Sequence, residues 1–254
     1  MGRDLLVRSL LGGAVSLGIG AAAAAIAVVI GTLYGAIAGF VGGRVDAVML
    51  RIVDVLFGLP YILLVVLLAV AVEGLADRLA MAAQQPEAMN AVERLAANAL
   101  LEHPVALNVV TLLLAIGSVS WLSMARVIRG QVLSLKAQPF MEACRAIGVP
   151  VRVQLMRHLL PNLVGPIVVY ATLTVPAAIL SESFLSFLGI GVREPLPSWG
   201  NLAADGLSEL NPVRMRWWLL VVPCTLIGVT LITLNVLGES LRDRLDPKRK
   251  VREA

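Results

Sequence analysis

The sequence predicts an all-α polytopic membrane protein, and three observations lead to this prediction. Hydrophobic residues make up 58% of the 254 residues and the mean hydropathy is +0.86, whereas soluble domains are roughly 45–50% apolar. The basic residues are also unevenly distributed, with more than half of them in two polar segments. Finally, five charge-free runs approach or exceed the ~20 residues that a helix needs to cross the hydrocarbon core; they are residues 9–43, 55–72, 103–125, 159–181 and 217–238.

Charge in the connecting segments predicts the orientation of these five spanning helices. Segment 126–158 has six basic residues against Glu142, and the tail 239–254 has six against four acids. Segment 73–108 is the reverse, with five acids and two arginines. Because Lys and Arg accumulate on the cytoplasmic side, we expect 126–158 and the tail to be cytoplasmic and 73–108 to be extracytoplasmic, within a single transmembrane domain over residues 1–254.

The first span begins with an unresolved question of parity and contains a candidate packing face. Five spans and a cytoplasmic C-terminus put the N-terminus outside, so either the short tail 1–4 crosses the membrane or an earlier span is missing from this chain. Gly31, Gly35 and Gly39 recur every four residues, a spacing that lets a second backbone approach closely. The alternative is chance in a region rich in alanine and glycine.

The two longest polar segments are expected to contain helices. Segment 73–108 has apolar residues at helical spacing on either side of a break at Gln84–Pro86, which favours an extracytoplasmic helical insertion over a disordered loop. Segment 126–158 predicts two short helices, 136–147 and 151–159, with Gly148 ending the first and Pro150 opening the second. Leu160 and Pro161 would then begin the next span.

The remaining spans contain prolines at 166, 176 and 223, which membrane helices tolerate. Between them, residues 184–216 are apolar and rich in glycine and proline, as is typical of an extracytoplasmic re-entrant or interfacial hairpin. Three tryptophans, Trp199, Trp217 and Trp218, would anchor it at the interface.

Glu182 lies inside or at the outer end of a hydrophobic run, next to Ser183. Carboxylates within membranes are commonly functional, so we expect one of two environments. Glu182 and Ser183 line the translocation pathway, or they lie near the lipid headgroups.

Several chemistries find no support in the sequence. The chain has no Gly-Lys pair and therefore no P-loop for ATP. His103 and His158 are predicted on opposite sides of the membrane, which leaves no metal site or catalytic triad, and we expect no cofactor on this chain. Cys144 and Cys224 lack the spacing of metal ligands. The basic segments have no interleaved aromatic residues, so nucleic acid is not expected as a partner.

Two motifs resemble the permease subunits of ABC importers. Glu142-Ala143-Cys144, followed by Gly148 and then Leu160-Pro161, is similar to the hallmark Glu-Ala-Ala motif, with Cys144 in place of the second alanine. Residues 185–200 resemble the second permease subunit of dipeptide, oligopeptide and nickel importers. Shorter matches occur at 2–4, 40–46, 51–54 and 241–247. The family has six spans and its Gly-Arg-Asp motif follows the first, so the resemblance favours a missing span; segment 73–108 is longer than usual.

The resemblance implies the type I permease fold and a defined assembly in the bacterial inner membrane. The partners would be a sister permease in a heterodimer, two ATPase subunits that hold ATP and Mg, and an extracytoplasmic solute-binding protein. The cytoplasmic two-helix segment would be the ATPase-coupling loop. By this resemblance the coupling residues are Glu142, Ala143, Arg145, Gly148, Pro150, Leu160 and Pro161. The alternative for Glu142 and Arg145 is an ordinary helix ion pair.

The function that these features favour is the import of dipeptides or oligopeptides, with ATP hydrolysed by partner subunits and not by this chain. A nickel or other small-solute importer of the same type is an alternative. A membrane scaffold or channel subunit without ATP coupling is a different class, and so is a membrane-embedded enzyme, for which few polar groups are available. No residue pattern in the spans indicates the substrate.

Overall fold

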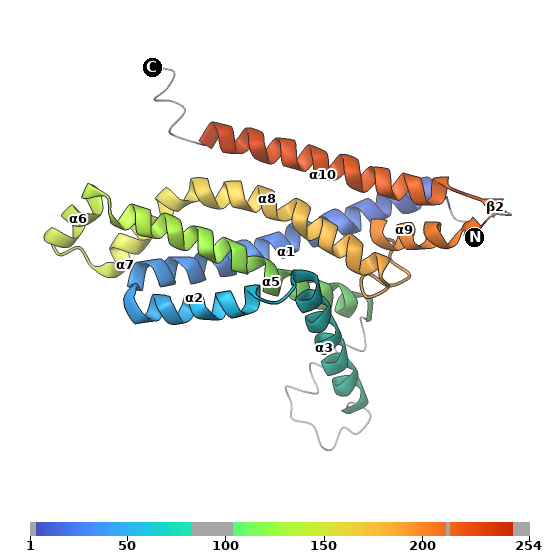
Figure 1. The fold of residues 1–254 in the computed structure, drawn as a ribbon, viewed down its shortest axis with the longest axis horizontal. Coiled ribbons are helices and arrows are strands. Elements are labelled where there is room, and N and C mark those ends of the chain that lie inside the picture. Colours follow the sequence, from blue (N-terminus) through green and yellow to red (C-terminus); the bar gives the residue numbers. More distant parts are fainter. Residues whose placement is uncertain (1–3, 83–103, 212–213, 246–254) are drawn as a thin grey trace. The chain divides into compact units, whose positions relative to one another are not determined.

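The computed structural model describes residues 4–82, 104–211 and 214–245, and helices account for most of them (Figure 1). The chain divides into two compact units. Unit 1 comprises 1–23, 61–117 and 177–231, and unit 2 comprises 24–60, 118–176 and 232–254. The elements are α1 (Leu5–Val41), α2 (Gly43–Phe57), α3 (Tyr61–Ala82), α5 (Pro104–Lys136), α6 (Pro139–Ala146), α7 (Val151–Val153), the π-helix η2 (Gln154–Leu159), α8 (Leu160–Phe187), α9 (Trp199–Ser208), β1 (Leu210–Asn211), β2 (Arg214–Met215) and α10 (Trp218–Leu245).

The helices are long and apolar enough to account for a multi-pass membrane protein. In the described part of the chain, four helical stretches meet the length and hydropathy expected of a span. These four are Leu5–Val41, Ala106–Lys136, Val151–Phe187 and Trp218–Arg244. The bent pair of α2 and α3 gives a fifth if the two helices are taken as one span. The prolines at 166, 176 and 223 lie inside α8 and α10 without ending them, as the sequence predicts.

The run 55–72 is not the single straight helix that its composition predicts. Helix α2 ends at Phe57 and α3 begins at Tyr61. The interruption follows from Pro60, since a residue before proline is disfavoured in the helical conformation. The apolar composition of residues 55–72 therefore predicted one span where the structure has a break between two helices.

Segment 126–158 is only partly a loop, and this corrects the predicted helix ends. Helix α5 continues to Lys136 without interruption. Helix α6 begins at Pro139, three residues later than the first predicted helix of this segment. Leu160 begins α8, but α7, η2 and α8 form one continuous stretch, Val151–Phe187, so the span begins earlier than the predicted Leu160 and Pro161. Residues 73–82 extend α3; the rest of the predicted insertion up to residue 103 is outside the described residues.

The segment 184–216 contains more regular structure than the predicted hairpin. Helix α8 extends to Phe187, a turn follows, and α9 begins after Ser198. Ser198 caps α9, because its Oγ accepts from the Asn201 backbone amide and the Asn201 Oδ1 accepts from the Ser198 backbone amide. These two bonds satisfy two free donors at the helix start. Strands β1 and β2 pair in antiparallel fashion beyond it.

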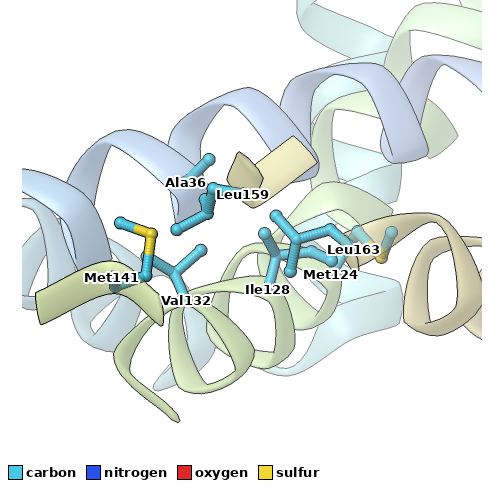
Figure 2. Close-up of a cluster of buried hydrophobic side chains, with 7 residues drawn as sticks. All are labelled: Ala36, Met124, Ile128, Val132, Met141, Leu159 and Leu163. Carbon is cyan, nitrogen blue, oxygen red and sulfur yellow. The ribbon is translucent and has the colours of Figure 1, made fainter. Parts of the chain in front are cut away.

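A cluster of buried side chains forms the hydrophobic core of unit 2 (Figure 2). It joins four parts of the chain, because α1, α5, α6 and the stretch from η2 into α8 each contribute to it. Phe40, Leu135, Ile167 and Tyr170 pack around its edge. The cluster consists of Ala36, Met124, Ile128, Val132, Met141, Leu159 and Leu163.

The glycine face of α1 lies against α5. A methyl group added at Gly35 would meet the carbonyl oxygen of Ala125 and the amide nitrogen of Arg129. One added at Gly31 would lie 2.8 Å from the Trp121 carbonyl oxygen. One added at Gly39 would lie 3.0 Å from the Arg129 carbonyl oxygen. The backbones of the two helices are therefore in contact, which is possible only without side chains at these positions.

Replacing Gly35 by alanine should destabilise the protein, because the new methyl group meets backbone atoms that cannot move independently. We expect a loss of roughly 1–3 kcal/mol, the usual cost of overpacking, measured as a lower midpoint of thermal unfolding in detergent. Gly130→Ala on the facing helix is the matched control: a Cβ there has open space within 4 Å, so it should be neutral or stabilising by up to ~1 kcal/mol. A Gly35→Ala protein that unfolds at or above the parent temperature would contradict this packing.

Candidate functional site

The elbow, defined here as residues 139–159, is the candidate site. Its first helix, α6, starts with Pro139 at the first position and ends in a Schellman turn. In this turn the Val149 amide donates to the Cys144 carbonyl at 2.9 Å, and the Gly148 amide donates to the Arg145 carbonyl at 3.1 Å. Gly148 has a φ of +73°, which glycine adopts at little cost. The predicted glycine and proline turn is therefore a defined backbone motif.

Most of the predicted coupling residues are exposed on the elbow or just beyond it. Glu142, Ala143 and Arg145 are exposed, as are Gly148, Pro150 and Pro161, while Leu160 is half-buried. A methyl group at Gly148 would meet nothing within 4 Å. Ile147 is 78% exposed, and exposed apolar side chains gathered on one surface commonly mark a protein contact. The other large apolar side chains exposed on the elbow are Phe140, Val151, Val153 and Met156.

The inner side of the elbow is fixed into the core of unit 2. Met141 from α6 and Leu159 from η2 are fully buried in the cluster shown in Figure 2. Cys144 is also buried. Gln154 ties the two arms together, since its Nε2 donates to the Val149 carbonyl at 2.6 Å. The elbow is thus a rigid projection with two buried anchors.

Two cations bind the ends of the helices that carry the elbow. Arg145 Nη2 donates to the Lys136 carbonyl at 3.0 Å, where α5 ends. Lys136 Nζ donates in turn to the carbonyls of Gly39 and Phe40 at 3.1 and 2.6 Å, near the end of α1. Positive groups at helix C-termini satisfy free carbonyls and the helix dipole. Arg145 is therefore a structural link, and the roles of Glu142 and Arg145 in coupling stay predictions.

Helix α2 is clamped to α5 by two ion pairs that sequence reasoning missed. Arg129 binds Asp46 through two hydrogen bonds of 2.6 and 2.5 Å, and Arg126 binds Asp54 at 2.7 Å while stacking on the Phe57 ring. The sequence does contain a sign of these ion pairs, because two acids lie eight residues apart on α2 and two arginines lie three residues apart on α5. The arginines were counted only as cytoplasmic charge, and this is why α5 was predicted to end before them.

In unit 1, Glu182 and Ser183 do not lie on the surface of the chain. Glu182 is 0% exposed, and its carboxylate accepts from Ser186 at 2.7 Å and from Ser183 at 3.3 Å. The described chain therefore supplies its own hydroxyl donors to this group. The role of Glu182 and Ser183 in lining a pathway stays a prediction.

The predicted interfacial tryptophans have different environments. Trp217 and Trp218 are exposed and in edge contact with each other. Trp199 is only 5% exposed, and its Nε1 donates to the Ser9 carbonyl at 2.9 Å, so its predicted anchoring at the interface is wrong. Gly13 of α1 leaves the space that the Trp199 ring occupies.

No metal or catalytic constellation emerges from the residues that the structure describes. Among them, no group of three or more His, Cys, Asp or Glu side chains could hold a metal ion. His158 is half-buried at the elbow, and His103 is outside the described residues. The elbow is the candidate site because it is exposed, rigid and rich in accessible polar and apolar groups.

Comparison with known proteins gives one family and several close relatives. Residues 27–251 match the family of binding-protein-dependent transport system inner membrane components. The chain is 42% identical over 247 residues to the oligopeptide transport system permease protein OppC of Haemophilus influenzae, covering 97% of this chain and 68% of that one. It is 44% identical to OppC of Escherichia coli K12, covering 97% and 70%. It is 40% identical to the dipeptide transport system permease protein DppC of Bacillus subtilis, covering 98% and 67%.

A solved structure has the same fold at low sequence identity. A chain of the MetNI methionine ABC transporter, in an inward-facing conformation, aligns with a TM-score of 0.68 and 14% identity. The alignment covers 97% of this chain and all of that one. The described helices therefore have the arrangement of an ABC importer permease, as the sequence predicts.

The bidentate pair of Asp46 and Arg129 should contribute more to stability than the pair of Asp54 and Arg126. The Asp46 side chain is 13% exposed and the Asp54 side chain 54% exposed, so water screens the second pair more. In double-mutant cycles with Asp→Asn and Arg→Gln, we expect a coupling free energy of roughly 1–3 kcal/mol for the first pair. The second should give less than ~1 kcal/mol. Denaturant unfolding in detergent provides both values, and equal coupling in the two cycles would refute the ranking.

Proposed function

The chain belongs to the family of binding-protein-dependent transport system inner membrane components, and we propose that it is the transmembrane subunit of an ATP-driven peptide importer. A member of this family is a permease subunit and not itself an enzyme. The chain would form half of the translocation pathway, with a sister permease forming the other half. Two ATPase subunits would bind ATP and Mg on the cytoplasmic side, and a solute-binding protein would deliver the substrate from outside.

Peptides are the substrate class that the relatives favour. The relatives named above are oligopeptide and dipeptide permeases at 40–44% identity, and the match extends over nearly the whole of this chain. Nickel or another small solute is the alternative carried by the same motif at 185–200. A scaffold or channel subunit without ATP coupling would need no rigid exposed elbow, and a membrane enzyme would need converging catalytic groups.

The elbow is the observation that carries the coupling proposal. Its exposed surface includes an acidic side chain, Glu142, that no side chain in the described chain neutralises, next to the exposed apolar Ile147. Such a mixture of a free charge and an apolar anchor is suited to a groove on another protein. Gly148 leaves open space at the turn, which a partner surface can approach closely.

Movement of an ATPase subunit would reach the spans through the two buried anchors. If closure of the ATPases on ATP displaces the elbow, Met141 and Leu159 transmit the displacement to the core of unit 2, because a closely packed core does not deform continuously. Arg145 and Lys136 prevent the elbow from pivoting independently of the ends of α5 and α1. The elbow thus acts as a lever and not as a flexible tether.

The proposed orientation in the bacterial inner membrane follows the distribution of basic residues. The elbow and the C-terminal tail 239–254 would be cytoplasmic, where Lys and Arg accumulate. Segments 73–108 and 184–216 would then be extracytoplasmic. The exposed Trp217 and Trp218 would lie at the outer interface.

Replacing Gly148 by tryptophan should block ATPase docking without removing the protein from the membrane. Both Gly148→Trp and Gly148→Ala place a Cβ in the left-handed region, at a cost of about 1–2 kcal/mol, but only tryptophan fills the open space. We expect the tryptophan variant to lose peptide uptake and co-purification of the ATPase, while the alanine variant retains most of both. Membrane levels are checked by immunoblot, and normal uptake by Gly148→Trp would count against docking at the elbow.

Cysteine labelling should place the elbow in the cytoplasm. The reporter is Arg152→Cys in a chain that also carries Cys144→Ser and Cys224→Ser. It should react with an impermeant maleimide in inverted vesicles from which urea has removed the peripheral subunits. It should not react in intact spheroplasts. Arg152 is exposed, so protection from outside would reflect the membrane. Trp217→Cys is the control of opposite sidedness. Labelling of the residue at 152 from outside would reverse the orientation.

A further inference from the structure

Glu182 is the centre of a hydrogen-bond network that joins three elements of unit 1. The carboxylate accepts hydrogen bonds from Ser183 and Ser186 of its own helix α8, and the side chains of Ser16 from α1 and Ser198 at the start of α9 lie beside it. All four serines are buried. We refer to Glu182 and these four residues as the serine lock.

Three of the serines connect the carboxylate to the backbone of the following segment. Ser186 Oγ accepts from the Val192 amide at 3.0 Å, Ser16 Oγ from the Trp199 amide at 3.3 Å, and Ser198 Oγ from the Asn201 amide at 3.3 Å. Each of these hydroxyl oxygens is therefore used as an acceptor, and Ser186 also donates its proton to Glu182 at 2.7 Å. Chains of this kind strengthen cooperatively when every member is satisfied.

A carboxylate is the side chain that completes this arrangement. It accepts hydrogen bonds at both oxygens and donates none when ionised, and it faces four donors. A glutamine would accept at one oxygen, while its amide would present two donors to hydroxyls whose own protons would lose their acceptor. A leucine would leave the hydroxyl protons of Ser183 and Ser186 without their acceptor in a buried site, which is the costly outcome.

The backbone packs closely around the lock at two glycines. A methyl group at Gly200 would meet the Ser183 carbonyl and the Ser186 side chain, and one at Gly191 would meet Ser186 itself. Beyond the lock, the Trp199 ring is held against α1 by its bond to the Ser9 carbonyl. The segment from Val192 to α9 is thus fastened to α1 and α8 at several points, with Glu182 at their centre.

We propose that Glu182 is a positioning residue of the transport cycle: through the serine lock it fastens helix α9 to α1 and α8, so that these three move as one body. Glu182 acts here through the serines, and this role is separate from the predicted lining of the pathway. The functional half of this inference rests on the proposed importer, whereas the structural half does not.

The test uses the whole importer in membrane vesicles, with Ala203→Cys as a reporter in a chain carrying Cys144→Ser and Cys224→Ser. Ala203 is buried in α9, and Leu207→Cys, exposed in the same helix, is the matched control. We expect Glu182→Leu to raise the rate of maleimide labelling at 203 at least about tenfold, because the unsatisfied hydroxyls release α9, and to leave labelling at 207 unchanged. Ser16→Ala, which removes a single link, should raise the rate severalfold and covers the case in which Glu182→Leu fails to assemble.

Transport provides the second readout, with Glu182→Gln as the conservative variant. At equal levels of assembled complex, we expect Glu182→Leu to lower peptide uptake and binding-protein-stimulated ATP hydrolysis about tenfold, and Glu182→Gln, which keeps one acceptor oxygen, to give values between those of Glu182→Leu and the parent. A reporter at 203 that stays unreactive in Glu182→Leu and Ser16→Ala would overturn the lock. A released α9 with uptake within twofold of the parent would overturn its role in transport. Absence of uptake by the parent chain itself would refute the importer proposal, and the labelling result would still decide the lock.

Discussion

The contact between the backbones of α1 and α5 is the constraint on which unit 2 depends. It exists because Gly31, Gly35 and Gly39 present no side chains to α5. Lipid offers no hydrophobic driving force between helices, so close packing and polar contacts hold them together. With the two helices in contact, Lys136 reaches the carbonyls at the end of α1, and the core that anchors the elbow closes around Ala36 and Val132. The exposed elbow is therefore a consequence of small residues located outside it.

Several polar groups in the described part of the chain find their partners in distant parts of the sequence. Arg129 finds Asp46 across 83 residues, and Trp199 finds Ser9 across 190. In an apolar environment an unsatisfied group is expensive, so each such pair fixes the register of two helices. The two units apply the same rule differently, with ion pairs between α2 and α5 in one and hydroxyls around a carboxylate in the other.

Composition and turn residues predicted the helical class, the long apolar spans and the elbow's glycine turn, because these depend on local properties. Helix ends were less predictable. Arg126 and Arg129 suggested the end of a span, yet their acidic partners on α2 let α5 continue to Lys136. Trp199 suggested an interfacial anchor, yet Gly13 provides the space that buries it. Both errors concern residues whose environment is set by a distant segment, which a single sequence read along its length does not reveal.

The π-helix η2 is the last part of the elbow and continues into α8 without a break. Each residue of an α-helix advances the chain by about 100° around its axis, and a π turn contains more residues per turn than an α turn. The direction in which Ile147 and Glu142 point around the axis of α8 is consequently set by the π-helix η2 together with the register of α8. A related chain could redirect the exposed surface of its elbow by losing or gaining such a turn, with every residue of the surface itself unchanged.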